Sequence, residues 1–116
     1  MTYRPPIQFA ELLGFSKEVI RLLDDDEFAK LQNALSAAPG SGKVIRTSDG
    51  LRKIRWAGSG RGKRGGLRVI YYWWVAPEII ILCDIYPKNE KENLSPREIE
   101  DLCQQVESFR RQYGKS

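Results

Sequence analysis

The residues of this chain that could do chemistry are lysines and arginines, and they are concentrated in one stretch. Residues 43–74 hold nine Lys and Arg residues against a single acid, Asp49, which gives this stretch a net charge of +8. The whole chain carries +4, so the remainder carries −4. Charge segregated this sharply indicates a face that binds a polyanion. The chain has no histidine, so acid–base chemistry would fall to lysine, arginine, tyrosine or carboxylates.

Two predicted strands, residues 51–57 and 67–75, carry part of this charge. Side chains alternate between the two faces of a strand, so Lys53 and Arg55 share a face of the first strand. On the second strand, Arg68 shares a face with Ile70, Tyr72 and Trp74. Cations beside aromatic rings suit RNA, because arginine holds phosphates and rings stack on unpaired bases.

The aromatic residues of these strands also allow a plainer interpretation. Trp56, Trp73 and Trp74, taken singly, are more typical of a core or a packed sheet face than of a binding surface. The basic residues on the same strands keep the interpretation as an RNA-binding surface open.

The glycine-rich loop between the strands resembles two phosphate-binding motifs but satisfies neither. Residues 60–65 match G-x-G-x-x-G, yet that motif needs a helix directly after the loop, and residues 67–71 are predicted to be a strand. A P-loop is excluded because Ala57 stands at its first glycine and Arg64 at its Ser or Thr. The loop is therefore interpreted as a basic hairpin connection.

The elements that must position these residues are predicted on both sides of the two strands. A short extended segment is expected at 6–9, and Ser16 would cap a helix that ends near Leu23. The acidic run 24–27 suits the start of a second helix, which Pro39 and Gly40 end. A short strand is expected at 44–46 and a third main strand at 79–86. The short connections predict that the three main strands are antiparallel neighbours.

The C-terminal helix has the strongest sequence pattern. Ser95 and Glu98 form a capping-box pattern around Pro96, a residue favoured in the first helical turn. One apolar stripe follows and should pack on the sheet; its members are Ile99, Leu102, Cys103, Val106, Phe109 and Tyr113.

Length and composition indicate one globular domain over residues 1–116. No apolar run approaches the ~20 residues that span a bilayer, and the N-terminus lacks the pattern of a secretion signal, so a cytoplasmic protein is expected. Cys83 and Cys103 are predicted to be buried free thiols, because the chain lacks the histidines and the C-x-x-C spacing of zinc sites.

Three segments together resemble one family of bacterial proteins. They are Gly-Leu-Arg-Lys-Ile-Arg at 50–55, Arg-Val-Ile-Tyr-Tyr at 68–72 and Ile-Tyr-Pro-Lys-Asn-Glu at 85–90, with the basic loop between the first two. In this order and spacing they are similar to the HigB branch of the RelE/HigB/ParE toxins of type II toxin–antitoxin systems. The resemblance implies an α+β fold: a small antiparallel sheet with two N-terminal helices and a packed C-terminal helix.

The resemblance also implies an endoribonuclease and its catalytic positions. Lys53 and Arg55 match the basic strand residues of the family's active site, and Arg68 matches the arginine that contacts the scissile phosphate. Lys88 falls on the basic residue after the third strand. The C-terminal catalytic tyrosine of RelE has no direct counterpart, and Tyr86 is the nearest candidate. A further set is predicted to bind RNA: Arg52, Arg61, Lys63, Arg64, Tyr72 and Asn89.

The expected reaction needs no metal ion or cofactor. The ribose 2′-OH would attack the adjacent phosphodiester, while arginines stabilise the charge that develops on the phosphoryl oxygens. Lys53 or Lys88, crowded by other cations, would move the proton, and Glu90 is the alternative base. One position departs from the RelE pattern: Asn89 stands where RelE toxins have a second arginine.

The resemblance implies that the protein cleaves mRNA on the ribosome and is held inactive by a HigA-like helix-turn-helix antitoxin. Operator DNA would be bound only through the antitoxin complex, and no membrane is involved. Two alternatives stay open at this point: a ParE-like toxin that inhibits gyrase, and a non-catalytic module that binds RNA or the ribosome.

Overall fold

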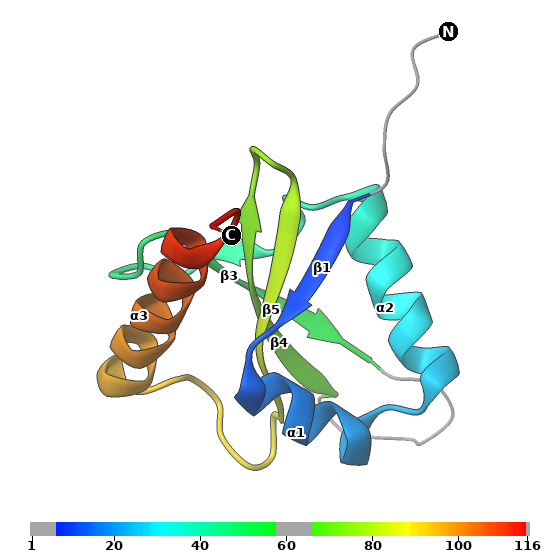
Figure 1. Cartoon of the computed structure of the whole chain (residues 1–116). Coiled ribbons are helices and arrows are strands. Elements are labelled where there is room, and N and C mark those ends of the chain that lie inside the picture. The colour runs from blue at the N-terminus through cyan, green and yellow to red at the C-terminus, as the bar shows by residue number, and fades with distance from the viewer. Residues whose placement is uncertain (1–6, 58–65, 116) are drawn as a thin grey trace, which may run out of the picture.

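The computed structural model describes residues 7–57 and 66–115 of the chain. Three helices and five strands follow one another in these residues (Figure 1). In chain order they are β1 (Gln8–Glu11), α1 (Leu13–Leu22), α2 (Asp25–Ala37), β2 (Lys43–Val44), β3 (Leu51–Trp56), β4 (Leu67–Trp74), β5 (Ile79–Pro87) and α3 (Pro96–Gln112).

The strands form one sheet in the order β1-β5-β4-β3-β2. The three main strands are antiparallel neighbours, as predicted from their short connections. The sheet is mixed, however, because β1 pairs with β5 in parallel, with Gln8 opposite Ile79. A parallel pair needs a long connection, and all the elements between β1 and β5 supply it.

Helices cover both faces of the sheet (Figure 1). On one face α1 and α2 pack against alternate residues of the strands, including Val69, Tyr71 and Leu82. On the other face α3 packs against the intervening residues, such as Ile70 and Ile81. This two-sided burial explains why β4 and β5 are apolar almost throughout, and it confirms the predicted α+β fold.

The helix starts agree with the sequence in two cases and differ in one. The Asp24 side chain caps α2 by accepting from the Glu27 amide at 2.8 Å. Ser95 and Glu98 form the predicted capping box of α3. Ser16, predicted as a cap, instead lies inside α1, and its hydroxyl donates to Glu11 Oε1 at 2.6 Å. The helix begins earlier because the chain turns directly out of β1.

The smaller predictions need only slight correction. The short strand predicted at 44–46 is β2, two residues long and one residue earlier, and the extended segment predicted at 6–9 is β1. Cys83 is buried and Cys103 half-buried, and both thiols are free. Within the described ranges, no helix is long and apolar enough to cross a membrane.

One buried hydrogen-bond relay fixes the chain between α2 and β2. The Tyr71 hydroxyl donates to the Pro39 carbonyl at 2.7 Å and accepts from the Gly42 amide at 2.8 Å.

Replacing Tyr71 with phenylalanine should destabilise the fold by about 1–3 kcal/mol, because it leaves two backbone groups unsatisfied. Urea unfolding measures this loss. The control is Tyr72→Phe, whose hydroxyl makes an exposed contact with Arg110 and should change stability by less than about 0.5 kcal/mol; equal losses would contradict the role of the relay.

Candidate active site

The register of the sheet aligns predicted catalytic side chains across three strands. Arg68 on β4 lies opposite Arg55 on β3 and opposite Tyr86 on β5. Opposed residues point to the same face, with Cβ atoms ~4.5–5.5 Å apart. Lys53 lies opposite Ile70, two residues further along the same face. Lys53, Arg55, Arg68 and Tyr86 therefore form one group on the α3 face, which we call the cross-strand cluster.

A β-bulge in β5 places Tyr86 in this cluster. The pairing between β4 and β5 shifts between Ile70 and Tyr71, so that Cys83 is an extra residue of β5. Strict alternation would put Tyr86 on the face of Leu82, toward α1 and α2. The extra residue reverses the alternation, and Tyr86 lies on the α3 face beside Arg68.

Arg68 is the deeply buried charge of the cluster, with 2% of its surface exposed. Its Nη2 donates to Glu92 Oε2 at 3.3 Å, and the Glu92 side chain is 58% exposed. A buried guanidinium presents its planar set of donors in a fixed direction, which suits a phosphate. Glu92 is an exposed anion that a phosphate oxygen could replace at Arg68.

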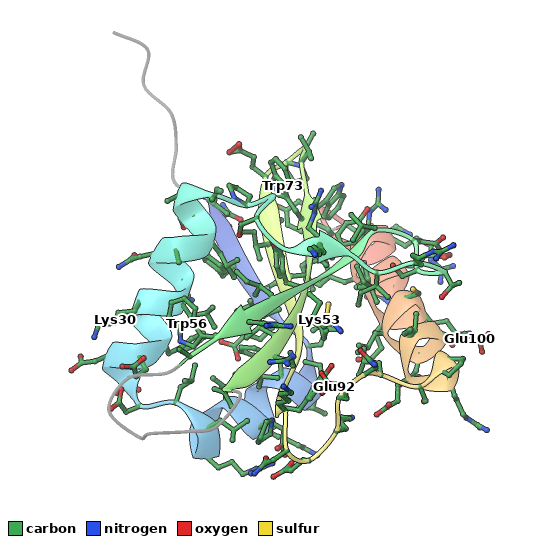
Figure 2. The ribbon with its side chains drawn as sticks, turned by 180° about the vertical axis from the view of Figure 1, so that it is seen from behind. Lys30, Lys53, Trp56, Trp73, Glu92 and Glu100 are labelled. Atoms are coloured by element: carbon green, nitrogen blue, oxygen red, sulfur yellow. The ribbon has the colours of Figure 1, made fainter. Side chains whose placement is uncertain are left out.

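Lys53 is held by the loop that joins β5 to α3. Its Nζ donates to Asn93 Oδ1 at 2.8 Å. Figure 2 shows Glu92 near Lys53, on the loop that runs from the end of β5 to α3. Two consecutive loop residues, Glu92 and Asn93, thus contact two cations of the cross-strand cluster.

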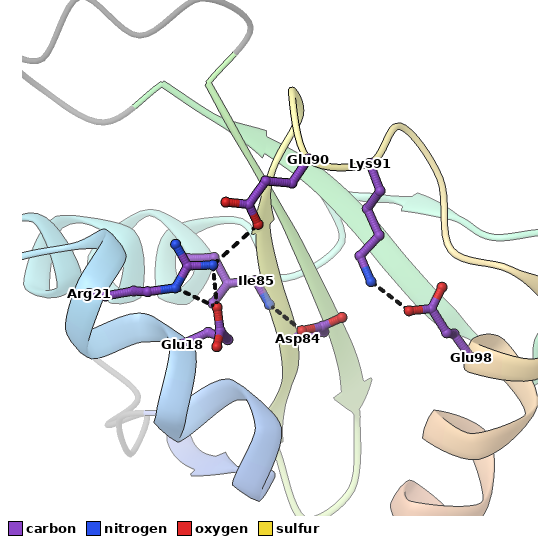
Figure 3. Close-up of polar contacts among 7 residues, drawn as sticks. All are labelled: Glu18, Arg21, Asp84, Ile85, Glu90, Lys91 and Glu98. Carbon is purple, nitrogen blue, oxygen red and sulfur yellow. Dashed lines mark hydrogen bonds and ion pairs between the residues drawn. The ribbon is translucent and has the colours of Figure 1, made fainter.

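Ion pairs anchor this loop to the helices on either side of it (Figure 3). Glu90 accepts from Arg21 of α1 at 3.2 Å, and Lys91 donates to Glu98 of α3 at 2.5 Å. The hydrogen bond from Lys91 is the main cause that lowers the pKa of Glu98. These contacts also place Glu90, the alternative base in the sequence-based mechanism, against α1, whereas Glu92 is the carboxylate at Arg68.

A pocket of about 380 Å³ opens beside the cluster. Its walls come from β2 and the turn after it, from the loop before α3 and from the first turns of α3. Lys53 and Tyr86 belong both to the cluster and to the pocket; the other lining residues are Lys43, Val44, Ile45, Arg46, Asn93, Leu94 and Ile99.

Tyr86 has an unusual environment for a tyrosine. Its side chain is buried, and its hydroxyl has no hydrogen-bond partner among the described residues. Lys91 Nζ lies 5.0 Å from the centre of its ring. Burial, reinforced by the nearby Asp84 carboxylate, raises the pKa of Tyr86 to about 12. At neutral pH the hydroxyl is therefore protonated and acts as a hydrogen-bond donor rather than as a phenolate base.

The raised pKa of Tyr86 predicts a loss of stability in alkali. The folded state keeps the proton up to about pH 12, whereas an unfolded tyrosine loses it near pH 10, so the free energy of unfolding should fall as the pH rises across this interval. Tyr86→Phe should flatten that fall. Urea unfolding at pH 8, 10 and 11 measures it, with the exposed Tyr113→Phe as control. Equal pH dependence in the Tyr86 variant and the wild type would contradict the assignment.

The other predicted site residues lie further from the cluster. Lys88 and Asn89 are exposed in the turn after β5, and the Lys88 amide donates to the Gly66 carbonyl at 3.1 Å, beside the sheet end. Arg52 points to the opposite face, where it donates to the Gly40 and Gly42 carbonyls and lies over the ring of Trp73. Arg52 therefore braces the chain before β2 and lies outside the cluster.

The remaining predicted RNA-binding residues lie away from the cross-strand cluster or outside the described residues. Tyr72 is four residues along β4 from Arg68, ~13 Å at the rise of a strand, and it pairs with Arg110 of α3. Trp56 and Trp73 pack into the core under α2, and Trp74 packs against α3, as their packing interpretation predicted. The loop residues Arg61, Lys63 and Arg64, and the G-x-G-x-x-G match, fall outside the described residues.

The sequence did not point to Glu92 and Asn93, because nothing in their spacing relates them to the strands. Lys43 and Arg46 were counted in the basic stretch but given no role, and the structure places both at the pocket. Among the residues that the structure describes, no group of three or more Cys, Asp or Glu side chains could hold a metal ion. What the site offers is fixed cations, one buried hydroxyl donor and a partly apolar pocket, which is a chemistry suited to a phosphodiester.

No family model matches the sequence. Among solved structures, the chain is similar to a double arginine-to-alanine mutant of the E. coli toxin RelE in the free state. The TM-score is 0.57 at 12% sequence identity, and the match covers 88% of this chain and 98% of that one. At this identity the likeness concerns the fold. The order of elements, the mixed sheet and the helices on its two faces together give this chain a RelE-like fold.

Proposed function

We propose that this protein is the toxin of a type II toxin–antitoxin pair, of the HigB branch, and that it cleaves mRNA on the ribosome. The observation that carries the proposal is the sheet register, which gathers Lys53, Arg55 and Arg68 on one face. These are the residues that the resemblance to RelE and HigB toxins assigns to catalysis. The RelE-like fold supports the same proposal.

The proposed reaction is attack by a ribose 2′-OH on the neighbouring phosphodiester, with departure of the 5′-oxygen. Arg68 and Arg55 hold the phosphoryl oxygens, where preorganised charge is usually the largest contribution to catalysis. Lys53 lies one step along the same face, where its amine carries the proton from the attacking 2′-OH to the departing 5′-oxygen. Tyr86 lies opposite Arg68 on β5 and offers a hydroxyl that is protonated at neutral pH.

Binding partners follow from the same proposal. The basic stretch supplies electrostatic attraction to mRNA and ribosomal RNA, which predicts binding that weakens as salt rises. A HigA-like helix-turn-helix antitoxin holds the protein inactive, and operator DNA is bound only through that complex. No cofactor is required.

The test is to add the protein to translating ribosomes and to map the 5′ ends of the mRNA. New ends that depend on the ribosome are expected. Intact mRNA together with trapped gyrase–DNA complexes would favour a ParE-like toxin instead. Tight ribosome binding without new ends would make the protein a binding module and would overturn the nuclease proposal.

A further inference from the structure

The pocket beside the cross-strand cluster has the chemistry of a nucleobase site. It holds about 380 Å³, within the ~300–1,000 Å³ usual for small-ligand sites. Ile45, Leu94 and Ile99 give it apolar walls, which suit the flat faces of a base. Its neutral polar side chains are few, Tyr86 and Asn93, as in specific ligand pockets generally.

The buried hydroxyl of Tyr86 is the first indication that a polar ligand enters. Tyr86 lines the pocket, and 3% of its surface is exposed. Its hydroxyl makes no hydrogen bond to any described residue, although buried polar groups are nearly always paired. A base edge carries both donors and acceptors, so it can pair with a hydroxyl that neighbouring side chains leave unsatisfied.

The amide of Asn93 is the second polar group. Its Oδ1 accepts from Lys53 at 2.8 Å, which fixes the orientation of the amide at the pocket. An oriented amide can pair with one base edge and reject another, because its donor and acceptor positions are no longer interchangeable.

The charge around the pocket favours an occupant that belongs to a nucleic acid. Lys43, Arg46 and Lys53 surround the pocket with three positive charges. An uncharged apolar ligand gains nothing from them, whereas the phosphates on either side of an unpaired base do. Because Lys53 and Tyr86 also belong to the cross-strand cluster, the base and the scissile phosphate would be neighbours along one RNA chain.

We propose that this pocket takes one unstacked nucleobase next to the scissile phosphate and so sets the sequence preference of the enzyme. Asn93 and Tyr86 read the edge of the base, and Ile45, Leu94 and Ile99 enclose its faces. As a specificity site for cleavage this inference rests on the proposed nuclease function, but binding of a base can be measured without cleavage.

The binding test uses the four nucleoside 3′-monophosphates as probes of the full-length protein, followed by NMR. Resonances of the Asn93 side-chain amide and of the Ile45, Leu94 and Ile99 methyl groups should shift and saturate, and the four bases should differ in affinity. Shifts that omit these residues, or that are identical for all four bases, would overturn the inference.

The cleavage test uses an mRNA randomised on both sides of the cut. Ile45→Trp fills the pocket and should reduce the preference at one flanking nucleotide at least about fivefold, the scale of one lost base contact. The matched control, Ile20→Trp, adds the same ring to α1 at a position 81% exposed and should keep the wild-type preference. Thermal unfolding checks that both variants fold, and the exposed Asn93→Leu serves as a second variant.

The two tests separate the pocket from the nuclease. Selective nucleotide shifts without any RNA cleavage would support the base site and refute the nuclease. Cleavage by Ile45→Trp and Asn93→Leu with unchanged base preference would leave the nuclease standing and refute the base site.

Discussion

Replacing Arg68 with lysine is expected to lower the rate of RNA cleavage by about 10²–10³-fold, the usual effect of losing one preorganised donor to a transition-state anion. Lysine keeps the charge but loses the planar fork that can bind two phosphoryl oxygens at once. Arg68 is 2% exposed and contacts Glu92, so its guanidinium is held in one position. A mobile charged side chain at the surface cannot take over this role. Growth of cells that express the variant should recover accordingly.

The control for this change is another arginine held by carboxylates. Arg21 donates to Glu18 and Glu90 on the α1 side of the sheet, so Arg21→Lys alters the same kind of contact away from the cluster (Figure 3). Lysine keeps the positive charge that pairs with Glu90 and anchors the loop, so this variant should keep full activity. Lysine is preferable to alanine at position 68, because alanine would leave a cavity in the sheet and would remove the cation that pairs with Glu92. Full toxicity of a correctly folded Arg68→Lys variant would refute the assignment of this residue.

The secondary structure was predictable because several local patterns agree in this sequence. Each of these patterns predicts the structure of the residues next to it. They are the capping box at Ser95, the acidic start of α2, and the glycines and prolines between elements. The parallel pairing of β1 with β5 was missed for the opposite reason. β1 has four residues, and its partner lies some seventy positions away, so no local pattern records the pairing.

The arrangement of the candidate site was predictable only in part, because strand alternation gives the face of a residue but not its partner. Alternation put Lys53 with Arg55, and the register then brought Arg68 beside them. For Tyr86 alternation alone is misleading, since the extra residue at Cys83 reverses the face. Glu92 and Asn93 reach the cluster through the tertiary position of a loop, which ion pairs to two helices determine.

Lys53→Met is the second change with a large expected effect, a loss of about 10²–10⁴-fold in kcat, the contribution typical of a proton-transfer group. Methionine keeps the unbranched chain as far as Cε and removes the amine. RNA affinity should change far less than kcat, because one phosphate contact among many is lost. Single-turnover cleavage with excess protein separates the two quantities.

Two companion variants decide what the amine of Lys53 does. Lys53→Arg keeps the positive charge but cannot give up a proton near neutral pH, so it should be as inactive as Lys53→Met if proton transfer is the role. Recovery of activity in Lys53→Arg would show that charge alone matters. Lys30→Met on α2, a lysine far from Lys53 in Figure 2 and paired with Glu27 at 3.8 Å, controls for the loss of one positive charge. If Lys30→Met lost as much activity as Lys53→Met, the effect would belong to the overall charge of the protein and Lys53 would have no place in the reaction.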